Sequence, residues 1–216
     1  MTAASQQALT GLRDLTSLQW YVIPLLALLF YIYTKEIKKA KANGNWDAVL
    51  AGVTLFCADF LNETVNGWIL ALSGRSALWT APGPTALRTM IGWNVEIMFM
   101  FMILGIIYYN TVDSKDVKIL GIPNRWFWAT VYSLFCVFIE CYLNAANMLV
   151  WEYSFWDRTL AGVWLIVIFG YFWFFAITKF MLERKTMQKK IMVPVVLFTA
   201  AVLLNIIGLG FLGFNY

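Results

Sequence analysis

The chain has 216 residues, of which 61% are hydrophobic and only 13% are charged, and this composition is typical of an integral membrane protein. Its 16 Lys and Arg residues outnumber its 12 Asp and Glu residues, but they gather in particular connections, which excludes a nucleic-acid-binding patch. The sequence contains no histidine, which excludes histidine-ligated haem, histidine zinc sites and catalytic triads.

Six apolar stretches predict membrane-crossing helices, because about 20 apolar residues span a bilayer. The first is followed by lysines and by Asn43-Gly44-Asn45, which predict the end of a helix and a turn. Between the second and the third lies Pro82-Gly83-Pro84, a rigid turn that cannot continue a helix. The six predicted helices cover residues 18–33, 47–72, 87–110, 125–150, 160–181 and 191–214.

The distribution of Lys and Arg predicts the orientation of these helices. The connections after the first, third and fifth helices hold four, three and five of the 16 basic residues, and such connections stay on the cytoplasmic side. We therefore predict an all-α integral membrane protein: a single bundle of about six transmembrane helices over residues 1–216, with both termini on the outer side of a plasma or inner membrane. We interpret the basic connections, which include Lys115 and Lys118, as orientation signals rather than lipid-headgroup sites.

The second predicted helix contains the stretch around which the rest of the sequence is interpreted. Within Phe56 to Trp68, four polar residues follow helical spacing and therefore share one face: Asp59, Asn62, Glu63 and Asn66. A carboxylate at the middle of a bilayer costs about 2.5–3.5 kcal/mol on insertion scales, so a pair of them indicates a functional site.

Counting about 1.5 Å per residue from the basic ends of the helices places Glu63, Glu96, Glu140 and Asn205 at one depth, with Asp59 a turn deeper. No Lys or Arg lies deep within the apolar stretches to pair with the four acids, and Arg88 at the start of the third predicted helix is the only near candidate. We therefore expect the cluster to be partly protonated, hydrated or occupied by a cation. Amide side chains beside the acids can hold a protonated carboxyl by hydrogen bonds. Those amides are Asn62, Asn66, Asn94, Asn144 and Asn147, and the aromatic residues that could shape a pocket with them are Trp68 and Trp93.

Three functions remain open at this point. The first is an enzyme, an intramembrane cyclase or isomerase, in which Glu63, Asp59, Glu140 and Glu96 carry out acid-base chemistry on a hydrophobic, isoprenoid-like molecule or lipid. It needs no cofactor and no dedicated metal site. In having a glutamate at the centre of an early helix, the chain resembles the small histidine-free membrane terpene cyclases. Their Trp-Glu pair is replaced here by Asn62-Glu63.

The second function is transport or binding of a cation or a proton, with the same four carboxylates as oxygen ligands. The third is a structural subunit, because polar side chains also hold membrane helices together, at about 0.6 kcal/mol each. The sequence makes no prediction of the oligomeric state.

Overall fold

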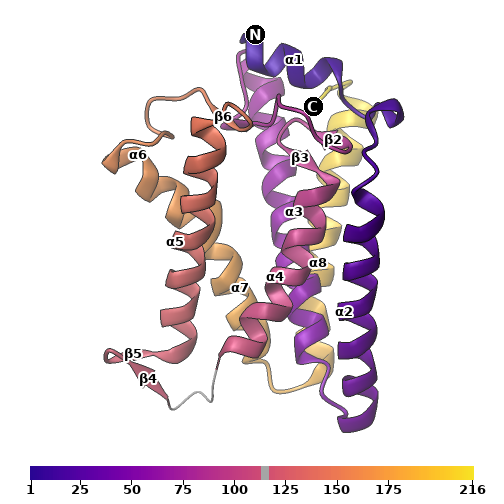
Figure 1. Ribbon diagram of the computed structural model, residues 1–216, viewed down its shortest axis with the longest axis vertical. Coiled ribbons are helices and arrows are strands. Elements are labelled where there is room, and N and C mark those ends of the chain that lie inside the picture. Colours follow the sequence, from indigo (N-terminus) through magenta and orange to yellow (C-terminus); the bar gives the residue numbers. More distant parts are fainter. Residues whose placement is uncertain (113–116) are drawn as a thin grey trace.

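Long helices make up most of the chain in the computed structural model, which describes residues 1–112 and 117–216 (Figure 1). Lys115, one of the predicted orientation signals, lies outside the described residues. In chain order the α-helices are α1 (Ala3–Thr10), α2 (Val22–Asn43), α3 (Asp47–Ser73), α4 (Val95–Thr111), α5 (Asn124–Ala145), α6 (Leu160–Leu165), α7 (Trp173–Leu182) and α8 (Met187–Asn205). A short 3₁₀ turn, η1 (Leu15–Ser17), precedes α2, and two π-helical segments, η2 (Ile166–Phe172) and η3 (Ile206–Phe211), follow α6 and α8.

Three small antiparallel pairs of strands lie at the ends of the helices. β1 (Trp79–Thr80) pairs with β6 (Val150–Trp151), so it joins the connection after α3 to the connection after α5. β2 (Arg88–Met90) pairs with β3 (Trp93–Asn94) immediately before α4, and β4 (Lys118–Ile119) pairs with β5 (Ile122–Pro123) before α5.

The lengths and hydropathy of the helices are those of an integral membrane protein. Four helical stretches in the described residues are long and apolar enough to cross a bilayer: Asp47–Ser73, Asn124–Ala145, Leu160–Leu182 and Met187–Phe211. α4 is apolar but has only 17 residues, and the second half of α2 carries lysines. The count of about six crossings therefore stays a prediction.

The boundaries of two predicted helices move for identifiable reasons, and the fourth predicted helix ends at Ala145 rather than at residue 150, where β6 begins. The first helix begins at Val22 and continues through the lysines to Asn43, because Lys, Glu and Ala are good helix formers. It ends at Gly44, whose φ of 74° is the left-handed conformation predicted for this turn. The third helix begins at Val95 rather than at residue 87, because the Asn94 side chain caps it and the preceding residues form the β2–β3 pair.

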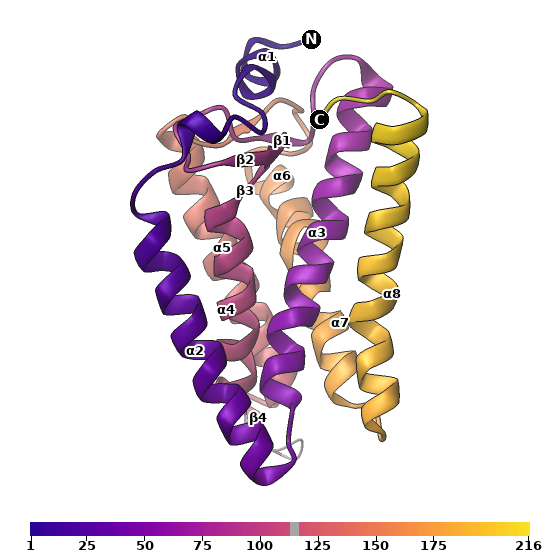
Figure 2. The ribbon, with the colours of Figure 1, turned by 90° about the vertical axis from the view of Figure 1, so that its right-hand side faces the viewer.

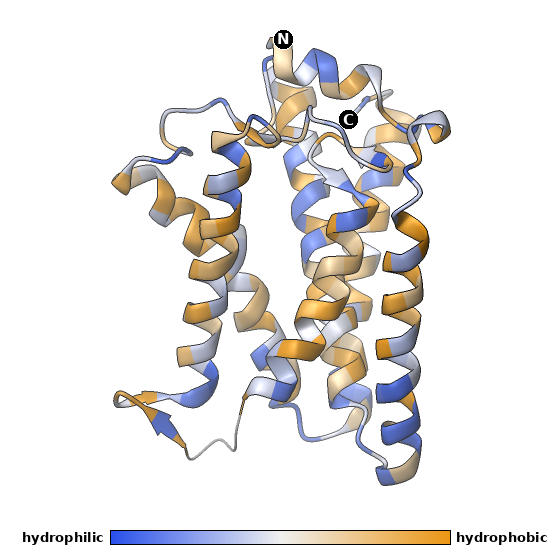
Figure 3. Ribbon diagram, in the orientation of Figure 1, coloured by the Kyte–Doolittle hydropathy of each residue, from blue (hydrophilic) through white to orange (hydrophobic). Residues whose placement is uncertain are grey.

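Both termini lie at the same end of the bundle, and the helices run lengthwise between this end and the opposite one (Figures 1 and 2). The lysine-bearing end of α2 lies at the end away from the termini, and hydrophobic residues line the length of the helices (Figure 3). The basic residues of the first and fifth connections are therefore on the side of the molecule opposite to the termini, as the charge distribution predicts.

The closest helix packing joins α3 to α4. A Cβ atom built on Gly105 would lie 2.6 Å from the Cα atom of Gly52 and would also clash with the carbonyl oxygen of Ala51. Two glycines facing each other in this way let the helix backbones approach closely, as is common in membrane helix pairs. This contact fixes the position of α4 along α3, and with it the height of the connection that joins them.

Candidate functional site

Asp59 and Glu63 lie one turn apart on α3, and both are almost completely buried, with exposed fractions of 4% and 3%. Each accepts a hydrogen bond from an indole nitrogen. The Nε1 atom of Trp93 lies 2.6 Å from Oδ2 of Asp59, and the Nε1 atom of Trp79 lies 2.7 Å from Oε1 of Glu63. Both tryptophans belong to the connection between α3 and α4, so this connection supplies a hydrogen-bond donor to each acid.

Asn66, one turn beyond Glu63, holds Trp79 in place. Its Oδ1 atom accepts from the backbone nitrogens of Leu78 and Trp79, at 2.8 and 3.3 Å, and its Nδ2 atom donates to the Trp79 carbonyl at 2.7 Å. At Gly92 a Cβ atom would lie 2.5 Å from the Trp79 ring and 2.8 Å from Oε2 of Glu63. The connection can therefore enclose Glu63 only with glycine at this position.

Arg88 anchors the same connection from the other side. Its guanidinium donates to the carbonyl oxygens of Ala81, Gly83 and Ala8, at 2.7, 2.8 and 3.0 Å. Burial lowers the pKa of this guanidinium, an effect that the nearby Glu96 carboxylate opposes. Arg88, at the start of the third predicted helix, forms no ion pair with the acids among the described residues.

A cavity of about 400 Å³ opens beside Asp59 and Glu63, and Glu140 of α5 lines its opposite wall. Glu140 is close enough to both acids of α3 to interact with them electrostatically, and the Tyr171 hydroxyl of η2 lies against it within reach of a side-chain hydrogen bond. Tyr171 is fixed by stacking on Phe101, with ring centroids 6.2 Å apart. The cavity therefore has two polar walls, the pair on α3 and the Glu140–Tyr171 pair.

The rest of the cavity wall is apolar. Side chains of α2, α4, α5 and α7 complete it, and no Lys or Arg is among the described residues that line it. Met100 and Phe135 line the cavity and are 58% and 55% exposed, so the cavity reaches the lateral surface of the bundle between α4 and α5. The apolar and aromatic lining residues include Leu28, Ile97, Phe101, Leu143, Trp156, Ile166 and Phe174.

Two buried polar atoms on residues that line the cavity have no hydrogen-bond partner among the described residues. They are Oε2 of Glu63 and Nε1 of Trp156, whose indole stacks on that of Trp79 with ring centroids 5.8 Å apart. Unpartnered buried polar groups are uncommon and costly, and they concentrate at functional sites. Two residues of the cavity wall therefore each keep one buried polar atom without a partner in the described part of the chain.

Glu96 is not part of this cavity, although the depth count places it level with Glu63 and Glu140. It lies in the first turn of α4 and accepts from Tyr21, Thr85 and the Ala86 nitrogen, at 2.7, 2.9 and 2.7 Å. Burial, followed by the hydrogen bond to Glu96, raises the pKa of Tyr21 to about 12, so this hydroxyl stays protonated and keeps donating. Glu96 therefore ties α2 and the α3–α4 connection to α4.

Of the other predicted pocket residues, some line the cavity and others hold turns or helix contacts outside it. Asn62 lines the cavity beside the acids. Asn94 caps α4 by accepting from the Ile97 nitrogen at 2.9 Å, and Asn144 donates to the Leu149 carbonyl at 3.0 Å. Asn147 is exposed with a φ of 57°, and Trp68 donates to the Leu204 carbonyl at 3.3 Å. These four residues hold turns and helix contacts and do not line the cavity.

Sequence reasoning missed three residues that complete the site, namely Trp79, Trp156 and Tyr171. The two tryptophans lie in connections, where aromatic residues usually indicate a membrane interface. Tyr171 lies in an apolar helix without acids. Its one signal is the π-helical segment, a local feature that is frequent at functional sites but is not visible in the sequence. Among the described residues no group of three or more Asp, Glu and Cys side chains is placed to hold a metal ion.

The indole bond to Glu63 gives a direct test of this geometry. We expect Trp79→Phe to lower the free energy of unfolding by about 1–3 kcal/mol, because it leaves both oxygens of a buried carboxyl group without a donor. Thermal unfolding in detergent, followed by circular dichroism, measures the change. Trp164→Phe is the matched control, since Trp164 is 49% exposed. Equal melting temperatures for the two variants would contradict the assignment.

Comparison with known proteins identifies a family that matches this chain, but no matching solved structure. A family model described as an uncharacterized membrane protein family matches residues 2–210. An uncharacterized protein of Archaeoglobus fulgidus is 40% identical over 190 residues, which cover 88% of this chain and 87% of that protein. No solved structure matches the chain.

Proposed function

The chain belongs to this uncharacterized membrane protein family, and we propose that it is an enzyme that isomerises or cyclises a hydrophobic, isoprenoid-like molecule by acid-base chemistry. The observation that carries the proposal is the cavity, which Asp59 and Glu63 line on one side and Glu140 on the other, between apolar and aromatic walls. Because carboxyl groups inside a bilayer are costly, three of them around one cavity favour a chemical role over helix packing alone.

Each step of the proposed reaction is assigned to side chains that line the cavity. Glu63 in its protonated form donates its proton from Oε2 to an alkene carbon, an epoxide oxygen or a carbonyl oxygen of the substrate. The carbocation character that follows is stabilised by the faces of Phe101, Phe174 and Trp156. Glu140, supported by Tyr171, then takes a proton from a neighbouring carbon and a double bond forms there. The substrate gains one proton and loses one, so no oxidant or reductant is needed.

The lining of the cavity supports an uncharged substrate. A phosphate or diphosphate group would need cationic partners, and no Lys or Arg is among the described lining residues. The lateral opening between α4 and α5 suits a molecule that enters from the bilayer.

We further propose that six helical stretches cross the membrane, with α2 and α4 added to the four stretches of sufficient length and hydropathy. In this arrangement the termini face outward and the basic end faces the cytoplasm of a plasma or inner membrane, which fits the positive-inside rule. Asp59, Glu63 and Glu140 then lie within the bilayer and the α3–α4 connection covers the site from the outer side.

The test is deuterium transfer from solvent. Host cells with and without the gene are grown in ²H₂O and in water, and their neutral lipids are compared by mass spectrometry. We expect a product that appears only with the gene when isolated membranes are supplied with unlabelled extract. If the proton is added to an alkene carbon, the product formed in ²H₂O carries one additional deuterium; if it is added to an epoxide or carbonyl oxygen, that deuterium exchanges away and the new product itself is the readout. Identical lipid profiles in all cultures would overturn the proposal, and acid-dependent ion flux into vesicles would then favour the transport alternative.

A further inference from the structure

A second groove lies at the basic end of the molecule, between α7 and α8. It has a volume of about 350 Å³, and its floor and sides are apolar. The two residues that carry charge on it are Arg184 and Lys189. The residues that line it are Ile177, Phe180, Arg184, Lys189, Met192, Val193, Val196 and Leu197, and none of them lines the cavity described above.

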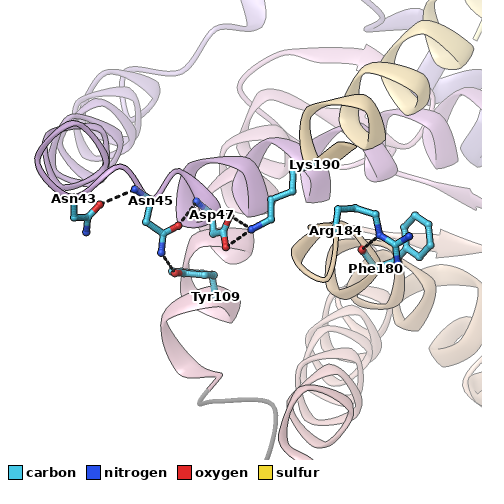
Figure 4. Close-up of polar contacts among 7 residues, drawn as sticks. All are labelled: Asn43, Asn45, Asp47, Tyr109, Phe180, Arg184 and Lys190. Carbon is cyan, nitrogen blue, oxygen red and sulfur yellow. Dashed lines mark hydrogen bonds and ion pairs between the residues drawn. The ribbon is translucent and has the colours of Figure 1, made fainter. Parts of the chain in front are cut away.

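Arg184 is held in a fixed position at this groove (Figure 4). Its Nε atom donates to the Phe180 carbonyl at 3.0 Å, and its guanidinium carbon lies 3.8 Å from the centroid of the Phe180 ring. The Arg184 side chain has no other hydrogen bond and no ion pair within the described part of the chain. The two terminal amino groups are therefore available to an anion, and the groups that orient them belong to the groove itself.

The acids near the groove are already bound to other cations. Glu183 pairs with Lys179 at 2.9 Å, and Asp47 pairs with Lys190 at 2.6 Å, the latter visible in Figure 4. Lys189 is exposed and has no ion pair in the described residues. In the described residues, Arg184 and Lys189 thus have no acidic partner and lie directly beside an apolar groove, and the neighbouring Lys185 is unpaired as well.

We propose that this groove binds an anionic phospholipid, with the phosphate between Arg184 and Lys189 and one acyl chain along Phe180, Met192 and Val196. The charge and the shape both fit such a ligand, because a cationic end at the cytoplasmic membrane boundary continues into an apolar channel toward the bilayer centre. The proposal concerns a different surface from the cavity and does not depend on the proposed enzymatic function.

The experiment measures how much lipid the purified protein retains. The protein is reconstituted in nanodiscs that contain phosphatidylglycerol and phosphatidylcholine in equal amounts, released into mild detergent, and examined by native mass spectrometry. We expect preferential retention of phosphatidylglycerol, reduced about tenfold or more in the double variant Arg184→Gln/Lys189→Gln, because each cation near a membrane surface contributes about a factor of five.

Two further variants distinguish specific binding in the groove from non-specific attraction of anionic lipid by surface charge. Lys38→Gln/Lys41→Gln removes the same charge from exposed positions on α2 at the same end of the bundle, and we expect it to keep retention unchanged. Val196→Trp fills the groove at a residue that is 56% exposed, and we expect it to reduce retention while both cations remain. Equal losses in the two charge variants, or full retention in Val196→Trp, would overturn the proposal. Melting temperatures confirm that each variant is folded.

Discussion

Glu63→Gln should reduce turnover by about 100- to 10,000-fold, the usual contribution of a positioned general acid, while the protein stays folded. The amide matches the carboxyl group in shape and still accepts the Trp79 indole bond, so the packing of α3 is kept. It cannot donate a proton to a carbon or to an epoxide oxygen, because an amide N–H is far too weak an acid. The measurement is the rate of product formation in isolated membranes, per mole of folded protein.

Glu96→Gln is the control variant, which we expect to lose stability but not turnover. Glu96 accepts hydrogen bonds from Tyr21, Thr85 and the Ala86 nitrogen and lies outside the cavity, so its loss should lower the melting temperature and leave turnover per folded molecule near that of the unchanged protein. If Glu63→Gln is folded and retains its turnover, Glu63 is not the acid. If both variants lose turnover per folded molecule alike, the effect is not specific to the cavity, and the assignment of Glu63 as the acid is contradicted.

The largest expected effect on folding comes from Gly105→Leu. The first atom of the new side chain would lie 2.6 Å from the Gly52 Cα atom and still closer to the Ala51 carbonyl oxygen, and both are backbone atoms that cannot rotate away. Overpacking usually costs about 1–3 kcal/mol, and a backbone collision across a helix pair belongs above that range. We therefore expect almost no monodisperse protein by fluorescence-detected size exclusion after extraction.

Gly210→Leu makes the same chemical change where the structure has room. No heavy atom lies within 4 Å of the position that its Cβ would occupy, and the residue is exposed near the end of η3. We expect normal yield and a normal elution profile. A well-folded Gly105→Leu protein would show that α3 and α4 can separate, and the packing described for this pair would then be wrong.

Helical periodicity predicted the part of the site that one helix supplies. Asp59, Asn62 and Glu63 share a face because of their spacing alone, and the structure places all three on the cavity. The depth count also brought Glu140 to the correct height. It could not tell Glu140 from Glu96, because height along the bundle says nothing about which face of its helix a residue occupies or where the helix begins.

The remaining part of the site depends on chain segments without periodicity. Trp79 reaches Glu63 because Asn66 binds the backbone of the connection, and Trp93 reaches Asp59 because the β2–β3 pair shortens α4. Neither arrangement leaves a repeating pattern in the sequence. Tyr171 and Trp156 meet the cavity only through tertiary packing, which local propensity does not encode.

The two indole hydrogen bonds join acids to donors that are synthesised later in the chain. Trp79 follows Glu63 by 16 residues and Trp93 follows Asp59 by 34, so both acids are synthesised before either of their donors. If α3 enters the bilayer as it is made, its two acids enter without these donors, and each costs about 2.5–3.5 kcal/mol in its charged form. Entry as neutral carboxylic acids avoids much of this cost. The finished site would then begin with protons that its acids took up during membrane insertion.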